Sequence, residues 1–252
     1  MDLIHIHGYK CAGTTIEKVL LREYPDLLRI ESENSGQRLF FDDIPSNFLK
    51  VKAISSHLLS PQKNNSALQI SLIRDPYERL ISAWKFQNEV VAKDKSSFRE
   101  FVLKYKSSIL SNYQCKLLST QEKSKNFSSG WEINIDLEFL FGPNFFLGCV
   151  ERFDESMTLI EIMLKERGVV IDLSYPNIAN STKHIYGKRK IPDLKRFAYS
   201  SIDADNWLWK YTNKKMDSKI ESITNFKKYL ENFKERCNKS VYANANIKIL
   251  EI

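Results

Sequence analysis

Short apolar runs alternate along the chain with longer stretches in which apolar residues recur every three or four positions. The short runs predict strands at residues 3–7, 48–54, 68–73 and 145–150. The periodic stretches predict helices at residues 14–24, 77–91, 96–105, 107–119 and 154–167. Strands that alternate with helices are typical of a parallel sheet covered by helices on both faces, so the predicted fold class is α/β.

Proline and glycine mark several of the expected boundaries. Pro25 follows the first predicted helix, Pro76 opens the second, and Gly168 follows the helix at 154–167. The chain is mostly helical from about residue 204 to residue 239, with one break expected, and polar loops are expected at 123–130 and 177–190. No repeat or low-complexity linker divides the sequence, so we expect a single domain over residues 1–252.

Composition excludes a disordered chain and leaves the partner open. Hydrophobic residues make up 42% of the 252 residues, which is enough for a buried core. The formal net charge is +7. That charge fits lysines on exposed helix faces, and it equally fits an anionic partner such as a nucleotide, an acidic glycan or a nucleic acid.

The cysteines and the absence of long apolar runs bear on the compartment. The four cysteines are far apart and form no CxxC pair, which argues against a zinc site or a disulfide framework and suits a reducing compartment; they are Cys11, Cys115, Cys149 and Cys237. No apolar run approaches the roughly 20 residues that cross a bilayer. The first residues lead directly into the first predicted strand without a signal peptide. We therefore expect a cytoplasmic protein with no membrane span.

The first strand leads into a glycine-containing loop, Gly8–Thr15, that is similar to the G-x-x-x-x-G-K-[ST] phosphate loop. Its glycines let backbone N–H groups turn toward an anion at the positive end of the following helix, and Lys10 adds a full charge. Thr14 stands where the phosphate loop has lysine, and no apolar strand ends in an aspartate suited to hold Mg²⁺. On this segment alone, a tight turn without a ligand is an equally good interpretation.

A second string, Arg74–Trp84, follows the predicted strand at 68–73. Arg74 comes at the carboxyl end of that strand, where α/β folds bind ligands. Ser82 follows about two turns into the next helix, so a guanidinium and a hydroxyl could hold one phosphate from two sides. An ion pair at the helix start and a buried serine would explain single residues of this string, but not the whole of it.

Together the two strings resemble the PAPS-dependent sulfotransferases, where PAPS is 3′-phosphoadenosine 5′-phosphosulfate. The resemblance is closest to the carbohydrate O-sulfotransferases, the group of the heparan sulfate 2-O-sulfotransferases and their bacterial relatives. The segment His5–Thr15 resembles the family pattern H-I-x-K-x-[AG]-G-T-[ST] with one shift of register before Lys10. Arg74–Trp84 matches R-[DN]-P-x-x-R-x-x-S-x-[YW] without a gap.

Three later segments are also similar to family patterns, and the resemblance spans residues 3 to about 215; the segments are Asn112–Leu118, Val150–Ser156 and Asn180–Lys183. It implies one α/β domain with a parallel sheet, like that of nucleotide kinases. It also implies PAPS as co-substrate, with adenosine 3′,5′-bisphosphate as product.

The resemblance assigns roles to individual residues. The first loop would hold the 5′-phosphosulfate, and Lys10 would also stabilise the departing phosphate oxygen; the loop residues are Lys10, Cys11, Ala12, Gly13, Thr14 and Thr15. Arg74 and Ser82 would hold the 3′-phosphate. A basic segment would close over the same nucleotide, through Ser181, Thr182, Lys183, Lys188 and Arg189.

A general base is needed to take the acceptor proton, and His57 is the candidate. It follows the second predicted strand, near the sheet edge where Lys10 and Arg74 emerge. Family members of the heparan type place a histidine in a similar G-H segment, where this chain has Ser56 in place of glycine. A structural histidine at a strand end is the alternative. His5 and His7 are expected to be packed or hydrogen-bonded in the first strand.

The sequence thus predicts transfer of a sulfuryl group from PAPS to an acceptor hydroxyl, with a glycan as the acceptor that the family implies. No metal is expected, because a sulfuryl group carries less charge than a phosphoryl group. A lipid, a tyrosine or a small metabolite stays open as acceptor. Two other functions also stay open: a phosphate-loop kinase or nucleotide hydrolase, and a basic nucleic-acid-binding domain, although no nucleic acid partner is expected.

Overall fold

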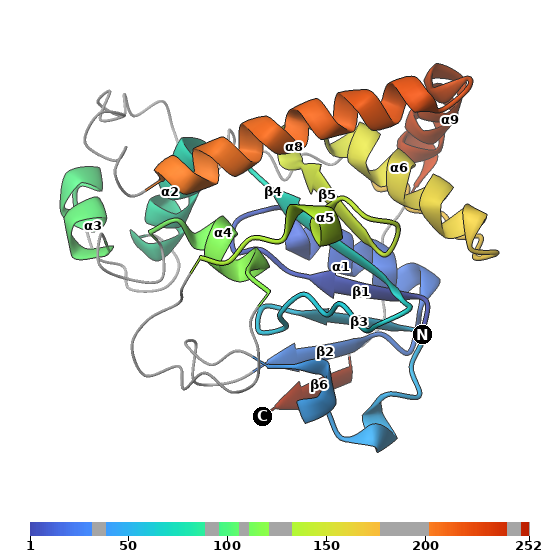
Figure 1. Cartoon of the computed structure of the whole chain (residues 1–252), viewed down its shortest axis with the longest axis horizontal. Helices are drawn as coiled ribbons and strands as arrows, with labels where there is room; N and C mark the ends of the chain where they lie inside the picture. Colours follow the sequence, from blue (N-terminus) through green and yellow to red (C-terminus); the bar gives the residue numbers. More distant parts are fainter. Residues whose placement is uncertain are drawn as a thin grey trace.

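The computed structural model describes residues 1–31, 39–88, 96–105, 111–120, 133–176, 202–240 and 248–251. Within these ranges one six-stranded parallel sheet has the order β5-β4-β1-β3-β2-β6 (Figure 1). The strands are β1 (Leu3–Ile6), β2 (Leu28–Glu31), β3 (Ala53–Ser56), β4 (Leu68–Ile73), β5 (Phe145–Cys149) and β6 (Lys248–Glu251). The predicted α/β class with a central parallel sheet is confirmed, whereas the single domain stays a prediction.

Helices flank the sheet, and three of them gather at the end to which the strand arrows point (Figure 1). These three are α2 (Pro76–Phe86), α3 (Phe98–Tyr105) and α4 (Tyr113–Leu118). Helix α1 lies behind the sheet in this view, and the long helix α8 packs against β5. The remaining bounds are α1 (Gly13–Glu23), α5 (Leu137–Leu140), α6 (Phe153–Glu166), α8 (Asp203–Ser222) and α9 (Phe226–Lys239).

The strongest strand predictions are the ones whose residues are buried on both faces. Every residue of β1, β3, β4 and β5 is buried, as expected for strands in a parallel sheet that helices cover on both sides. The predicted strand at 48–54 is shifted, because residues 46–48 form a 3₁₀ turn after Pro45 and the strand begins only at Ala53. Strands β2 and β6 are absent from the sequence-based prediction, since LRIE and KILE each have two charged residues among four and so form no apolar run.

The helices predicted at 14–24, 96–105 and 154–167 agree with α1, α3 and α6 within two residues at each end, whereas the one predicted at 77–91 is α2, which ends at Phe86. The break expected in the C-terminal helical part is confirmed between α8 and α9, where Asn225 has a φ of 61°. Gly168 ends the segment after α6 with a φ of 79°, which glycine adopts without strain. The helix expected at 107–119 begins only at Tyr113, and residues 106–110 lie outside the described ranges. The loops expected at 123–130 and 177–190 also lie outside them.

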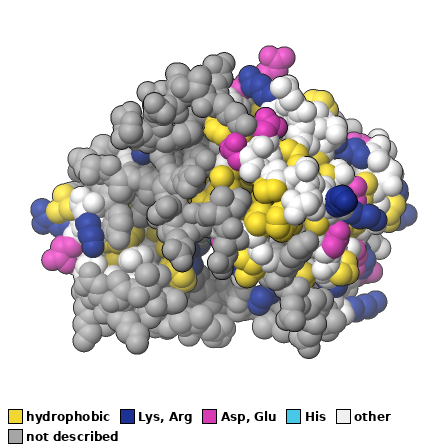
Figure 2. All heavy atoms as spheres, turned by 90° about the horizontal axis from the view of Figure 1, so that it is seen from below, with side chains coloured by type: hydrophobic (Ala, Val, Ile, Leu, Met, Phe, Trp, Pro, Cys, Tyr) yellow, Lys and Arg dark blue, Asp and Glu magenta, His cyan; other side chains and the backbone are white. Residues whose placement is uncertain are grey.

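Three further observations concern one face of the molecule, the cysteines and the length of the helices. On the face seen in Figure 2, hydrophobic side chains form a group among interspersed basic and acidic ones, and no histidine is visible among the described atoms. All four cysteines are free and buried. None of the helices in the described ranges combines the length and hydrophobicity that crossing a bilayer requires.

A buried polar cluster joins α2, α4 and α8 beneath the carboxyl ends of the strands. Asp205 of α8 is fully buried and accepts the backbone N–H groups of Gln114 and Cys115 at 3.1 and 2.8 Å. Burial raises the pKa of Asp205, while the charge of Arg79 and these hydrogen bonds oppose the rise. Arg79 of α2 is itself fully buried, with its guanidinium 5.0 Å from the ring centre of Tyr113. The cluster therefore fixes α4 against the two helices that border the sheet edge.

Replacement of Asp205 tests how much this cluster contributes to stability. In Asp205→Ala, two buried N–H groups lose their acceptor, and we expect the free energy of unfolding to fall by about 2–4 kcal/mol in urea titrations. Asp203→Ala is the matched control, because Asp203 lies on the same helix but is exposed. That variant should lose less than about 1 kcal/mol. Equal losses in the two variants would contradict the role given to Asp205.

Candidate active site at the carboxyl edge of the sheet

The strand order brings the predicted site residues to one edge of the sheet. Strand β1 lies between β4 and β3, so the loop after β1, Arg74 after β4 and His57 after β3 follow three neighbouring strands. The chain crosses over β1 when it passes from β3 to β4. Such a reversal of strand order opens a crevice at the carboxyl ends of the strands, where α/β proteins bind ligands. Sequence reasoning placed these three groups at this edge, and the fold brings them there.

The loop after β1 is shaped to receive an anion. Lys10 and Ala12 have positive φ values of 63° and 62°, and Ala12 caps helix α1 without a side-chain hydrogen bond. Within the described part of the chain, the N–H groups of Ala12, Gly13 and Thr14 have no acceptor, and the first turn of α1 has no acidic residue. Open N–H groups at the positive end of a helix attract phosphate and sulfate groups.

Two glycines allow the loop to pack this tightly. A Cβ atom on Gly13 would lie 1.8 Å from Cδ2 of His7, so only glycine fits beside that imidazole. A Cβ atom on Gly8 would approach both Cys11 and the Leu72 carbonyl oxygen at 3.2–3.3 Å. The spacing of the two glycines therefore reflects close contacts inside the protein as well as space for a ligand.

Two cations, Lys10 and Arg74, meet at this edge, and no carboxylate of the described residues pairs with them. The Lys10 ammonium lies 4.1 Å from the ring centre of Phe86, and its pKa is lowered by burial and by the nearby charge of Arg74. Among the described residues, neither Lys10 nor Arg74 forms a salt bridge. Like charges held close together destabilise each other until an anion binds between or beside them. The electrostatics of this edge therefore favour an anionic ligand.

Gln114 joins the two cationic segments, and the sequence analysis gave it no role. Its side-chain Oε1 accepts the backbone N–H of Arg74 at 2.7 Å and the thiol of Cys11 at 3.5 Å. Its Nε2 donates to the Arg74 carbonyl oxygen at 2.9 Å. Gln114 falls in the segment Asn112–Leu118 that resembles a family pattern, so a signal for it was present.

The start of α2 is fixed by Asp75 and Glu151, to which the sequence analysis gave no role in the site. Asp75 caps this helix by accepting the N–H groups of Tyr77 and Glu78 at 2.9 and 3.0 Å. The Asp75 N–H donates to Glu151 at 2.8 Å, and Glu151 also accepts the indole N–H of Trp209 at 3.2 Å. These bonds fix the backbone on which Arg74 stands.

The other predicted loop and nucleotide residues differ in their exposure. Thr14 is exposed and Thr15 half-buried at the start of α1, whereas Ser82 is buried on α2, about two turns after Pro76. Burial raises the pKa of the Cys11 thiol to about 12, so the thiol is neutral at pH 7. Five residues predicted to close over the nucleotide lie outside the described ranges; they are Ser181, Thr182, Lys183, Lys188 and Arg189.

His57 is held beside the loop by His7, the residue that follows β1. Its Nδ1 lies 2.7 Å from the backbone oxygen of His7, and its ring stacks on the His7 ring with 3.7 Å between centroids. A carbonyl oxygen can only accept, so Nδ1 of His57 carries the proton and Nε2 is the basic nitrogen. Burial and the nearby His7 lower the pKa of His57 to about 4, although the hydrogen bond to His7 and the charge of Glu17 oppose this. The imidazole is therefore neutral at pH 7.

His5 and His7 are hydrogen-bonded in the interior, as expected. Nδ1 of His5 lies 2.9 Å from Oγ of Ser55, and Nδ1 of His7 lies 3.1 Å from Oε1 of Glu17. Oγ of Ser55 donates to the same Glu17 oxygen at 2.7 Å. Sequence reasoning missed Glu17, although its position on the apolar face of α1, one residue after Ile16 and three before Leu20, was a signal of a buried charge.

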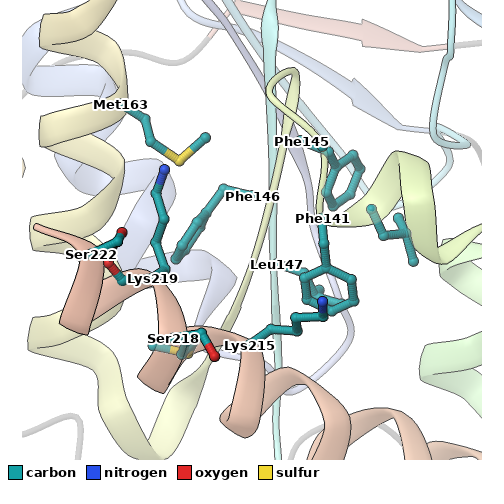
Figure 3. Close-up of a pocket in the computed structure, with 12 residues that line it drawn as sticks. Phe141, Phe145, Phe146, Leu147, Met163, Lys215, Ser218, Lys219 and Ser222 are labelled. Atoms are coloured by element: carbon teal, nitrogen blue, oxygen red, sulfur yellow. Dashed lines mark hydrogen bonds between the residues drawn. The ribbon is translucent and has the colours of Figure 1, made fainter.

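A separate hollow of about 280 Å³ lies between α5, β5, α6 and the second half of α8 (Figure 3). Its floor is apolar, with Phe145 and Phe146 from β5, and Lys215 and Lys219 extend along it from α8. None of the predicted site residues lines this hollow. We therefore place the functional site at the carboxyl edge and not here.

The fold and this edge define an α/β enzyme class that binds an anionic group on a glycine-containing loop at the start of a helix. A family model described as "Sulfotransferase family" matches residues 2–244, and the chain belongs to that family. It is thus an enzyme of sulfuryl transfer, which decides among the three functions that the sequence left open. A search of curated proteins found none that matches the chain.

In the described ranges, no group of three or more His, Cys, Asp or Glu side chains is arranged to hold a metal ion. The expectation of a metal-independent reaction stays a prediction.

The buried histidine and glutamate cluster should make stability depend on pH. The pKa of His57 is about 4 against an ordinary 6.5, and the pKa of His5 is also lowered by burial. Between these values the unfolded chain binds more protons than the folded one, so stability should fall as pH drops from about 6.5 to about 4. Glu17, whose pKa is lowered to about 2 from an ordinary 4.5, extends the loss to lower pH.

Urea unfolding between pH 7.5 and 4.5 measures this loss, for which we expect about 1–3 kcal/mol from His57 alone. The variant His57→Gln should show a smaller slope of stability against pH than the unmodified chain. Identical slopes would show that His57 takes up its proton equally in the folded and unfolded states.

Proposed function

We propose that this sulfotransferase takes the sulfuryl group from PAPS and transfers it to a hydroxyl group of a carbohydrate. The observation that carries the proposal is the pair of cations, Lys10 and Arg74, at the ends of adjacent strands without a carboxylate partner in the described ranges. PAPS carries anionic groups at both its 5′ and its 3′ position. Two cationic positions on neighbouring strands suit a ligand of that kind.

The two ends of the donor are assigned by the local chemistry of each position. The 5′-phosphosulfate lies against the open N–H groups of Ala12, Gly13 and Thr14, next to Lys10 and the hydroxyl groups of the two threonines. The 3′-phosphate lies against Arg74 and Ser82. This assignment agrees with the resemblance of both strings to the PAPS-dependent sulfotransferases.

The reaction needs charge stabilisation and one proton acceptor. The acceptor oxygen attacks sulfur while the bond from sulfur to the bridging phosphate oxygen breaks, and adenosine 3′,5′-bisphosphate leaves. The Lys10 ammonium stabilises the negative charge that develops on the leaving oxygen. Nε2 of His57 takes the acceptor proton, because Nδ1 is already engaged with the His7 carbonyl oxygen.

The carbohydrate acceptor follows from the resemblance to the carbohydrate O-sulfotransferases. The net charge of +7 also suits an anionic glycan. The cytoplasmic location, the absence of a nucleic acid partner and the metal-independent reaction stay predictions.

Removal of Arg74 tests the assignment of the 3′-phosphate. We expect Arg74→Ala to weaken PAPS binding about 10- to 100-fold, because a charge-assisted contact is lost. Adenosine 5′-phosphosulfate lacks the 3′-phosphate and should bind the variant and the unmodified protein alike. Isothermal titration calorimetry with both nucleotides measures the four affinities.

Arg167→Ala is the matched control, because Arg167 binds the carbonyl oxygens of Ser66 and Pro143 near the opposite ends of β4 and β5. It should leave PAPS affinity within about twofold, the range typical of a change outside the binding site. Unchanged PAPS affinity in Arg74→Ala, with the fold intact by circular dichroism, would reject the assignment.

Removal of His57 tests the proton acceptor. We expect His57→Ala to keep its affinity for PAPS while turnover falls about 10²- to 10⁴-fold, the usual contribution of a general base. Turnover is followed with radiolabelled PAPS and a panel of glycans, and added imidazole should restore part of it. Turnover that persists in the variant would show that another group takes the proton.

A further inference from the structure

Glu17 is a buried carboxylate that the proposed reaction does not use. Its exposed fraction is 3%, and it lies on α1, the helix whose first turn borders the donor loop. A buried charge is unfavourable unless its surroundings compensate for it. Here the described structure compensates it with hydrogen bonds from His7, which follows β1, and Ser55 on β3, and with the guanidinium of Arg29 on β2 at 3.8 Å.

The hydrogen bonds around Glu17 fix where the protons are. Its carboxylate accepts from Nδ1 of His7 and from the hydroxyl of Ser55, so both of these groups are donors. Because Ser55 gives its proton to Glu17, it accepts from Nδ1 of His5. Each histidine next to Glu17 therefore has a defined tautomer.

His7 joins this network to His57. His7 contacts His57 in two ways, by ring stacking at 3.7 Å and by the carbonyl oxygen that accepts the Nδ1 proton at 2.7 Å. These contacts follow from the register of the sheet, in which His5 is paired with Ser55 and Ile6 with Ser56, so that His7 and His57 come next. Side chains at alternate positions share a face, and that face is the one on which Glu17 lies.

We propose that Glu17 is a positioning residue for the general base. Through His7 it holds the His57 ring in place, and its negative charge stabilises the positive charge that His57 gains when Nε2 takes up the acceptor proton. This inference rests on the role of His57 in the proposed function. It adds a residue from the donor-binding helix to the acceptor side of the reaction. Loop, helix and base would then be aligned by a single carboxylate.

Electrostatics gives the carboxylate a second effect. The titratable and charged groups that act on His57 are His7, His5, Glu17 and Arg29. Burial, His7 and Arg29 lower the pKa of His57, and Glu17 is the one side chain among them whose charge raises it. Burial alone would raise the pKa of Glu17, but its bonds from His7 and Ser55 lower it to about 2, so the anion is present at neutral pH. A neutral residue at position 17 should leave His57 a weaker base.

Two substitutions separate charge from shape. Glu17→Gln keeps the size and one acceptor oxygen but removes the charge, whereas Glu17→Asp keeps the charge but shortens the side chain. Glu23→Gln is the control, since Glu23 lies on the same helix but binds Arg22 and the Asp172 N–H, away from the histidines. Thermal unfolding of each variant shows whether it is folded at the assay temperature.

We expect the kinetic order unmodified protein, Glu17→Asp, Glu17→Gln from fastest to slowest. The glutamine variant should lose about tenfold in kcat with KM for PAPS nearly unchanged, and the acid limb of kcat/KM should move down by about 0.5–1 pH unit. A purely structural role predicts the reverse order, because glutamine fills the space of glutamate and aspartate does not. The reverse order, or a Gln variant as fast as the unmodified protein, would overturn the inference.

A second measurement needs neither donor nor acceptor. Nitrogen NMR of ¹⁵N-histidine-labelled protein should show His57 with its proton on Nδ1 at pH 7, and the titration midpoint of His57 should be lower in Glu17→Gln than in Glu23→Gln. Equal midpoints overturn the inference, whatever the activity. If the unmodified protein bound no PAPS, the proposed function would fail, while the NMR comparison would still decide whether Glu17 acts on His57.

Discussion

One buried carboxamide holds together two positive segments that repel each other. The Gln114 side chain hydrogen-bonds to both the N–H and the carbonyl oxygen of Arg74. It also accepts a hydrogen bond from the thiol of Cys11, in the loop that contains Lys10. Gln114 is in turn fixed by Asp205, which accepts its backbone N–H. Neutral hydrogen bonds and the packing of α4 against α8 therefore offset the repulsion between Lys10 and Arg74. Without these hydrogen bonds, the two strand ends could separate and the cationic edge would be lost.

This arrangement prepares the site before any ligand arrives. Dipoles and charges that are already oriented need little reorganisation when negative charge develops in a transition state. The same holds for the acceptor side, where the sheet register sets His57 against His7 and the neighbouring carboxylate fixes the histidine protons. In the proposed reaction, helix α1 takes part on both sides. It begins at the loop assigned to the donor, and one turn later it contains Glu17, which contacts the histidine network of the proposed base. Both sides therefore depend on how this one helix is seated on the sheet.

The sequence was most informative where local chemistry and long apolar runs coincide. The strand at 68–73 and the string from Arg74 to Trp84 were found together, because a run rich in Leu and Ile ends directly at charged residues. Strands β2 and β6 were missed, since LRIE and KILE each have two charged residues among four and form no apolar run. The histidine network was also missed. Alternating positions of a strand are visible in the sequence, as His5 and His7 in one segment and Ser55 and His57 in another. Which residue of the first segment contacts which residue of the second depends on the register of the folded sheet.

The loop cysteine has a consequence for chemical labelling. Cys11 is buried between the glycine turn and Gln114, and its thiol stays protonated at neutral pH. Because thiolates are the reactive form, alkylating reagents can attack Cys11 only during excursions that expose the loop. Its rate of modification thus reports local opening of the loop, and a nucleotide bound at the proposed donor site should lower that rate.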